Sequence, residues 1–323
     1  MTRTRVFSPL LLRTAVVFTG AALLTGCAAG VPAASVRTAQ PDSSARAASE
    51  APGGSTVSRL DTMAEEANLA VVTRLFSVAF DDPDSAEAQA AAATSVAKDA
   101  VAHGSGSASG PAGLLAQFAA DHQRVTGAQM VAKHTAADGD LVAIHYQITA
   151  DPTDERTGEA AADVFRLSKG KIVERWTFTQ PVPQGKAASG NTNTMFSDLY
   201  SPAKPSPSPS EAQEEKNRAF AVNAYDALFR DHDVSILDRA FDPAYLQHNP
   251  VAPNGTTALK GFFSGGASLP AMESTVSLAD GDLVWTLSQS VGAETDDPYG
   301  ALDIFRVDGG LIREHWDVVP AAG

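Results

Sequence analysis

The chain has 323 residues, enough for two domains of ordinary size. Its formal net charge of −14 at pH 7 repels nucleic acid and anionic lipid head groups, so we exclude nucleic-acid binding. Cys27 is the only cysteine, which excludes an intramolecular disulfide and a metal site built on several thiolates.

The amino-terminal segment predicts export. Three arginines within the first 13 residues precede the short apolar run Thr14–Leu24, and Leu24-Thr25-Gly26-Cys27 follows. This is the pattern of a secretory signal, and the run is too short for a membrane span, which needs about 20 apolar residues. The ending LTGC resembles the bacterial lipobox. It implies that residues 1–26 are removed and that lipidated Cys27 anchors the protein at the outer face of the cell membrane. The alternative is an ordinary secretory signal that contains a cysteine.

Residues 27–58 are rich in Ala, Ser, Gly and Pro, and we expect a flexible tether because such a segment buries too little apolar surface to fold. A first domain is expected over residues 59–196. Its apolar spacing predicts three helices, at Leu60–Asp82, Glu87–Val101 and Pro111–His122.

The apolar pattern then changes to a period of two, which predicts strands. Four of them form an antiparallel meander in this interpretation, at Gln129–Thr135, Asp140–Thr149, Ala160–Leu167 and Lys171–Pro181. Helices followed by an antiparallel sheet indicate an α+β domain.

Residues 197–213 contain a Pro/Ser alternation that predicts an extended linker. A second domain, 214–320, repeats the same plan. Helices are expected at Glu214–Arg230, Val234–Phe241 and Asn254–Phe263, a loop at Tyr245–Pro250, and strands at Glu273–Leu278, Asp282–Ser290, Tyr299–Val307 and Leu311–Val319.

Two motifs recur in the same order in both halves. ADGDLV occurs at Ala137–Val142 and Ala279–Val284, and Asp163–Arg166 (DVFR) matches Asp303–Arg306 (DIFR). A repeat of this length predicts a tandem duplication of one domain.

The order YLQHNP, a helix after Gly255, ADGDLV, DIFR and EHWDV resembles the SnoaL-like proteins of the nuclear transport factor 2-like superfamily. The resemblance covers 214–320 and, more weakly, about 60–196. It implies two cones, each a bent antiparallel sheet wrapped by about three helices, with a pocket at the open end. Relatives often end in a segment like GNTMF, so we expect Gly190–Phe196 to belong to the first domain. The resemblance also implies pairing of the two cones through their sheets, or a homodimer.

Strand alternation in Leu311–Val319 places His315 and Asp317 on one face and Glu314 and Trp316 on the other. A neighbouring carboxylate stabilises a protonated imidazole and fixes its tautomer, as acid–base chemistry requires. Asp303 lies on the partner strand, and the hairpin register decides whether it faces His315. The catalytic candidates are therefore Asp303, His315 and Asp317.

The ligand-binding candidates are Tyr245, Gln247, His248 and Trp316. A structural interpretation competes with this one, in which Trp316 lies in the core and His248 holds a loop. The first half has Arg175 and Thr177 in place of the histidine and the aspartate, which argues against chemistry there.

No metal site and no cofactor are expected, because the seven histidines are scattered and no phosphate-binding loop follows a strand. We therefore predict a lipid-anchored, extracytoplasmic protein whose second cone binds a small apolar molecule. An enzyme of the cyclase or isomerase type is the first alternative, and a structural module with filled cones is the second. An open cavity with His315 and Asp317 converging in it would favour the enzyme.

Overall fold

The computed structural model describes residues 55–104, 108–185, 187, 189–204, 207–265, 270–294 and 299–320, with side chains from residue 61 onward. The expected signal peptide, Cys27 and almost all of the expected tether lie outside these residues. Within the described part of the chain, no helix is both long and apolar enough to cross a membrane.

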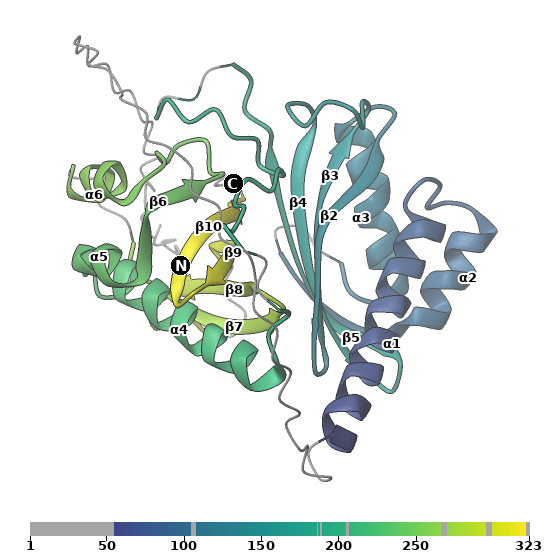
Figure 1. Ribbon diagram of the computed structural model, residues 1–323. Coiled ribbons are helices and arrows are strands. Elements are labelled where there is room, and N and C mark those ends of the chain that lie inside the picture. Colours follow the sequence, from purple (N-terminus) through teal and green to yellow (C-terminus); the bar gives the residue numbers. More distant parts are fainter. Residues whose placement is uncertain are drawn as a thin grey trace, which may run out of the picture. The chain divides into compact units, whose positions relative to one another are not determined.

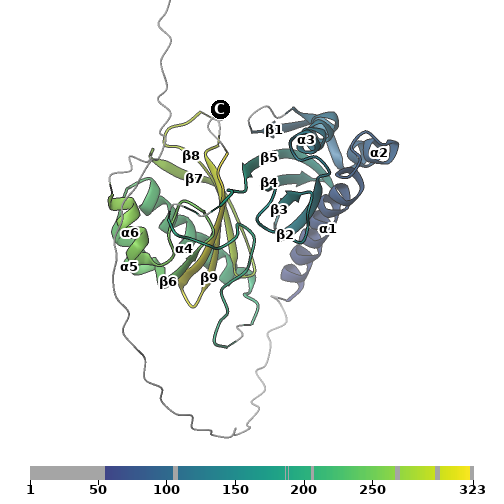
Figure 2. The ribbon, with the colours of Figure 1, turned by 90° about the horizontal axis from the view of Figure 1, so that it is seen from above.

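The first half forms a five-stranded sheet in the order β1-β5-β4-β3-β2. Strands β4, β3 and β2 of this sheet are labelled side by side in Figure 1, and β1 beside β5 in Figure 2. Strand β1 runs parallel to β5, and the other neighbours are antiparallel. The strands are β1 (Val96–His103), β2 (Gln129–Asp138), β3 (Leu141–Thr149), β4 (Glu159–Ser168) and β5 (Lys171–Pro181).

The second half forms a sheet of the same order, β6-β10-β9-β8-β7, again with its first strand parallel to its last. The strands are β6 (Phe241–Gln247), β7 (Met272–Asp280), β8 (Leu283–Ser290), β9 (Ala301–Asp308) and β10 (Leu311–Val318). The β9–β10 turn lies at Gly309 and Gly310, both with positive φ, as a tight hairpin requires.

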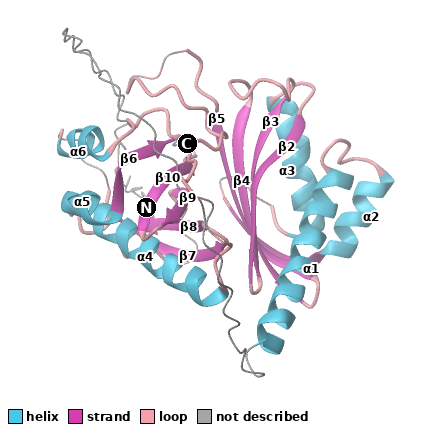
Figure 3. Cartoon of the chain, in the orientation of Figure 1, coloured by secondary structure: helices cyan, strands magenta, loops and turns pink. Residues whose placement is uncertain are grey.

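Helices cover one face of each sheet (Figures 2 and 3), so the α+β prediction with two cones is confirmed. The first sheet carries α1 (Ser55–Ala79), α2 (Ala86–Ser95) and α3 (Gly110–Arg124), and the second carries α4 (Glu211–Phe229), the 3₁₀ turn η1 (Val234–Ile236), α5 (Leu237–Ala240) and α6 (Thr256–Ser264).

Two local expectations were wrong, and the expected sheet composition was wrong with them. The predicted helix Glu87–Val101 ends at Ser95 and continues as β1, and the predicted loop Tyr245–Pro250 begins inside β6. Each sheet is therefore mixed and five-stranded, not a four-stranded antiparallel meander. Both missed strands form their ladder with a strand about 70 residues away, so no local periodicity marks them.

Strand β3 is buried at every position because both of its faces are covered. Val142 and Ile144 pack under the first set of helices with Phe76 and Phe118. The alternate side chains pack in an apolar cluster that also contains side chains of the second sheet. All three tryptophans, Trp176, Trp285 and Trp316, belong to this cluster.

The repeated ADGDLV motif makes reciprocal hydrogen bonds between the two halves. Asp138 Oδ2 accepts from the backbone N–H of Ala279 at 2.9 Å, and Asp280 Oδ2 accepts from that of Ala137 at 2.9 Å. The first aspartate of each ADGDLV copy, Asp138 or Asp280, therefore binds the other half of the chain as well as beginning the hairpin turn.

Candidate functional site

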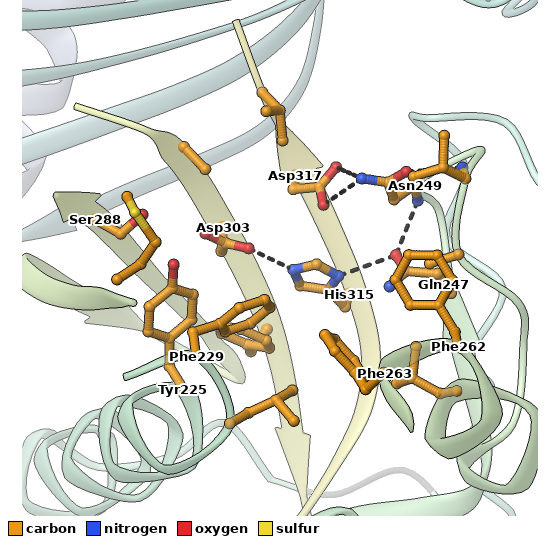
Figure 4. Close-up of a pocket in the computed structure, with 18 of the residues that line it drawn as sticks. Tyr225, Phe229, Gln247, Asn249, Phe262, Phe263, Ser288, Asp303, His315 and Asp317 are labelled. Atoms are coloured by element: carbon orange, nitrogen blue, oxygen red, sulfur yellow. Dashed lines mark hydrogen bonds and ion pairs between the residues drawn. The ribbon is translucent and has the colours of Figure 1, made fainter. Parts of the chain in front are cut away.

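The second cone contains a cavity of about 330 Å³ between its sheet and its helices (Figure 4). Its walls are largely aromatic and aliphatic, with polar groups gathered at one end and no lysine or arginine among the lining residues. The apolar lining comprises Leu228, Phe229, Phe241, Val251, Ala252, Leu259, Phe262, Phe263, Pro270, Met272, Gly300, Ala301, Phe305 and Val319.

The first cone differs, because its interior is filled. Beside Phe165 and Arg175 only about 10 Å³ is open. Asp163, the counterpart of Asp303, accepts hydrogen bonds from Tyr146 Oη at 2.7 Å and Thr177 Oγ1 at 2.5 Å. The arginine and threonine noted in the sequence thus lie in a packed interior with no room for a ligand of ordinary size.

Asp303, His315 and Asp317 converge at the polar end of the second cavity. One ligand-type atom from each lies within 4.8 Å of the others, and all three residues are buried. His315 Nε2 is 2.9 Å from Asp303 Oδ1. Asp303 therefore faces His315, which the sequence left open.

A β-bulge at Arg313 decides this register. Before it Ile312 pairs with Val307, and after it Glu314 pairs with Arg306, so Asp317 lies directly opposite Asp303. Because a one-residue slip turns every side chain to the other face, the bulge directs the later part of β10 into the cavity.

Hydrogen bonds fix the protonation of the imidazole. Gln247 Oε1 accepts from the backbone N–H of Asn249 at 2.8 Å, which orients the amide. His315 Nδ1, 3.0 Å from the same oxygen, must then carry hydrogen and donate. Its Nε2 faces a carboxylate oxygen, so a second proton lies between His315 and Asp303, on one or the other.

Asp317 is the second acid of the site. Both of its oxygens accept from Asn249 Nδ2, at 2.9 and 2.7 Å. Burial raises its pKa to about 6, with Asp303 adding to the rise while His315 and the Asn249 bond oppose it. At pH 7 Asp317 is thus an ionised base whose pKa lies near neutrality.

Two phenols line the same cavity. Burial and the nearby Asp303 and Asp317 raise the pKa of Tyr225 and Tyr245 well above the usual value, so both keep their protons. Asp303 Oδ2 is buried and has no hydrogen-bond partner. The polar end therefore combines a proton-holding pair, an ionised carboxylate and hydroxyl donors.

Of the four predicted ligand contacts, Tyr245 and Gln247 line the cavity, whereas His248 and Trp316 do not. The His248 ring stacks on Trp316 at 4.9 Å between centroids, and its Nε2 lies 2.9 Å from Glu314 Oε1. This is the opposite face of β10, so the structural interpretation of these two residues fits the geometry.

Asn249 was not among the candidates, although it adjoins His248 in the HNP motif. Tyr225, within the predicted helix Glu214–Arg230, was not among the candidates either. In both cases the residue type was suited to the site. Whether the side chain enters the cavity depended on how α4 and the β6–α6 loop pack against the sheet.

The same three side chains, Asp303, His315 and Asp317, form the only group in the described residues arranged to hold a metal ion. Both ring nitrogens of His315 already bind protein groups. His315 would therefore have to give up one of these hydrogen bonds to hold an ion.

Comparison with known families identifies part of the chain. Residues 72–175 match the family model of the SnoaL-like domain. The chain therefore contains a SnoaL-like domain. The matched segment lies in the first cone, where the sequence motifs indicated the weaker resemblance. Among proteins of curated function, none matches this chain.

Solved structures with a similar fold include a candidate SnoaL-like isomerase from Agrobacterium tumefaciens, at 16% identity and a TM-score of 0.31 over 35% of this chain and 97% of that one. IdmH, a candidate polyketide cyclase from Streptomyces antibioticus, has 22% identity and a TM-score of 0.28 over 35% and 91%. A candidate polyketide cyclase from Bacillus cereus has 18% identity and a TM-score of 0.30 over 35% and 74%.

Proposed function

We propose that the second cone is an acid–base catalytic site for a small, uncharged, largely apolar molecule that carries a carbonyl group. The observation that supports this most directly is the convergence of the protonated Asp303–His315 pair and ionised Asp317 in one apolar cavity. A site for binding alone does not need a base with a pKa of about 6 beside a second acid.

The proposed step is proton transfer at carbon. Asp317 takes a proton from the carbon next to the carbonyl, the electron pair of the C–H bond forms a carbon–carbon double bond, and the π pair of the carbonyl moves to its oxygen. A hydroxyl of Tyr225 or Tyr245, both of which keep their protons, donates a hydrogen bond to that oxygen. Return of the proton from Asp317 to another carbon of a conjugated enolate isomerises the molecule. Attack of the enolate carbon on a second carbonyl closes a ring, and the proton then goes from Asp317 to the new alkoxide oxygen.

The lining selects the ligand. Aromatic side chains from α4, α6 and β9 favour a flat or ring-containing body. The cluster carries one net negative charge, because the Asp303–His315 pair is neutral as a whole and Asp317 is ionised, and the lining has no lysine or arginine, so an anionic ligand would be repelled. A volume of about 330 Å³ is at the small end of the range for ligand pockets.

The test is hydrogen–deuterium exchange at the carbon next to the carbonyl of 2-tetralone, a neutral bicyclic ketone, followed by NMR in heavy water. We expect exchange above the buffer rate, and loss of about 100-fold or more in Asp317→Asn because general-base catalysis contributes about that much. Asp282→Asn is the control, since Asp282 pairs with Arg306 at the surface of the same cone. Equal exchange in Asp317→Asn and the parent would refute the assignment.

Binding without chemistry is the second candidate, supported by the size and apolar lining of the cavity. It predicts that 2-tetralone binds, as measured by calorimetry, with no exchange above background. A purely structural role fits the filled first cone but not the open second one.

Two further proposals concern the whole chain. The common strand order and repeated motifs support an origin by tandem duplication. The LTGC sequence supports lipid anchoring through Cys27 at the outer face of the membrane. Cys27→Ala should release the protein from the membrane fraction of cells, and continued retention would contradict the anchor.

A further inference from the structure

Segment 189–200, which follows the first sheet, binds the loop beside the second cavity. The amide of Asn191 is buried and lies within hydrogen-bond distance of three carbonyl oxygens. These are the carbonyls of Gln247 at 2.5 Å, Ala252 at 3.1 Å and Asn249 at 3.2 Å. The expectation that this segment belongs with the first domain is thus incomplete, because these hydrogen bonds go to the second half.

A second amide of the segment binds the same backbone. Asn193 Nδ2 donates to the carbonyl of Gln247 at 2.9 Å and to Asn254 Oδ1 at 3.0 Å. Asn254 Oδ1 also accepts from the backbone N–H of Gln247 at 2.8 Å. Inward-facing loop carbonyls need donors, and segment 189–200 supplies them.

This loop carries the two side chains that orient the acid–base cluster. The Gln247 amide binds His315 Nδ1, and the Asn249 amide binds both oxygens of Asp317. We propose that Asn191 and Asn193 are positioning residues of the second cone, which fix the 247–252 backbone so that these two side chains face the cluster.

The segment is also held by the first half of the chain. Thr194 Oγ1 donates to Glu155 Oε2 at 2.5 Å, and Phe196 packs in the apolar cluster that contains both sheets. The first half of the chain therefore contributes to the site of the second cone. The geometric part of this inference stands independently, whereas its catalytic meaning rests on the proposed function.

The test compares Asn191→Ala with Thr192→Ala, a neighbouring exposed position, as the matched control. Ring ¹⁵N NMR spectra of the seven histidines report the tautomer, with the His315 signals assigned from His315→Gln. We expect the His315 ring shifts to change in Asn191→Ala only, because the Gln247 acceptor is released. In the 2-tetralone assay, kcat should fall about 10-fold or more with little change in KM, since the apolar walls are intact.

Unchanged His315 signals in folded Asn191→Ala would overturn the proposal, and so would equal changes in the control. If Asn191→Ala does not fold, Asn193→Ala makes the same test through its bonds to Gln247 and Asn254. If the His315 signal shifts in Asn191→Ala but the parent protein does not exchange 2-tetralone, the positioning role of Asn191 stands and the catalytic function is refuted. The two failures are therefore distinguishable.

Discussion

A buried histidine pair in the first sheet gives a quantitative prediction for stability against pH. His134 Nδ1 and His145 Nδ1 are 3.0 Å apart, and His134 Nε2 is 3.2 Å from Asp198 Oδ1. With His134 donating to Asp198, its Nδ1 accepts from His145. His145 Nε2 is then a bare nitrogen that is buried and has no partner. Burial, then the neighbouring His134, His248 and Lys133, hold the pKa of His145 well below its usual value, against the opposing effect of Asp198.

Proton linkage gives the direction in which this histidine changes the stability of the fold with pH. His145 stays neutral in the folded chain, whereas in the unfolded chain it takes up a proton near its ordinary pKa of 6.5. Its contribution to stability is thus present above that pH and is lost as the pH falls. For one such group, the loss between about pH 7.5 and about pH 5 is about 2 kcal/mol.

The second sheet shows which residues can replace the two histidines, because Val276 pairs with Leu287 at the position where His134 pairs with His145 in the first sheet. The free energy of unfolding of the variant His134→Val/His145→Leu should therefore rise by about 2 kcal/mol relative to that of the parent when the pH is lowered from about 7.5 to about 5. The difference between the two proteins is the quantity to compare. Asp121 and Asp317, with pKa values raised to about 6, change stability in the opposite direction in both.

Urea denaturation followed by tryptophan fluorescence measures this difference, since all three tryptophans are buried in one apolar cluster and the Trp316 ring centroid lies 4.5 Å from that of His134. Circular dichroism serves as the control for direct effects of the histidines on fluorescence. Parallel pH dependences of the two proteins would refute the argument.

Three other changes have defined outcomes. Between about pH 4 and about pH 7, the free energy of unfolding of Asp317→Asn should rise by up to about 3 kcal/mol relative to the parent. The reason is that ionisation of a carboxyl with a raised pKa destabilises the folded parent over that range. A pH-independent difference in urea midpoints would contradict this. Trp316→Ala should cost about 3–5 kcal/mol by urea denaturation, since the ring is fully buried, and a cost below about 1 kcal/mol would show that the cluster is loosely packed. Asp138→Ala and Asp280→Ala should each cost about 1 kcal/mol in thermal unfolding and should match each other, because their bonds are reciprocal.

The site shows where inference from the sequence ends. Alternation alone placed His315 and Asp317 on one face, because side-chain direction in a strand is a local property. The pairing of Asp303 with His315 depended on the bulge at Arg313, which no local pattern marks. His248 and Trp316 had suitable chemistry, but the face on which they lie was set by the same register.

Sequence alone determined the α+β class, the repeated plan and the residue types of the acid–base cluster, because periodicity and motif order are properties of neighbouring residues. Tertiary structure decided that β1 and β6 join their sheets in parallel, that the first cone is filled and the second open, and that Asn191 reaches the second cone. These features depend on contacts between distant residues, and they arise only when sheets, helices and loops pack together.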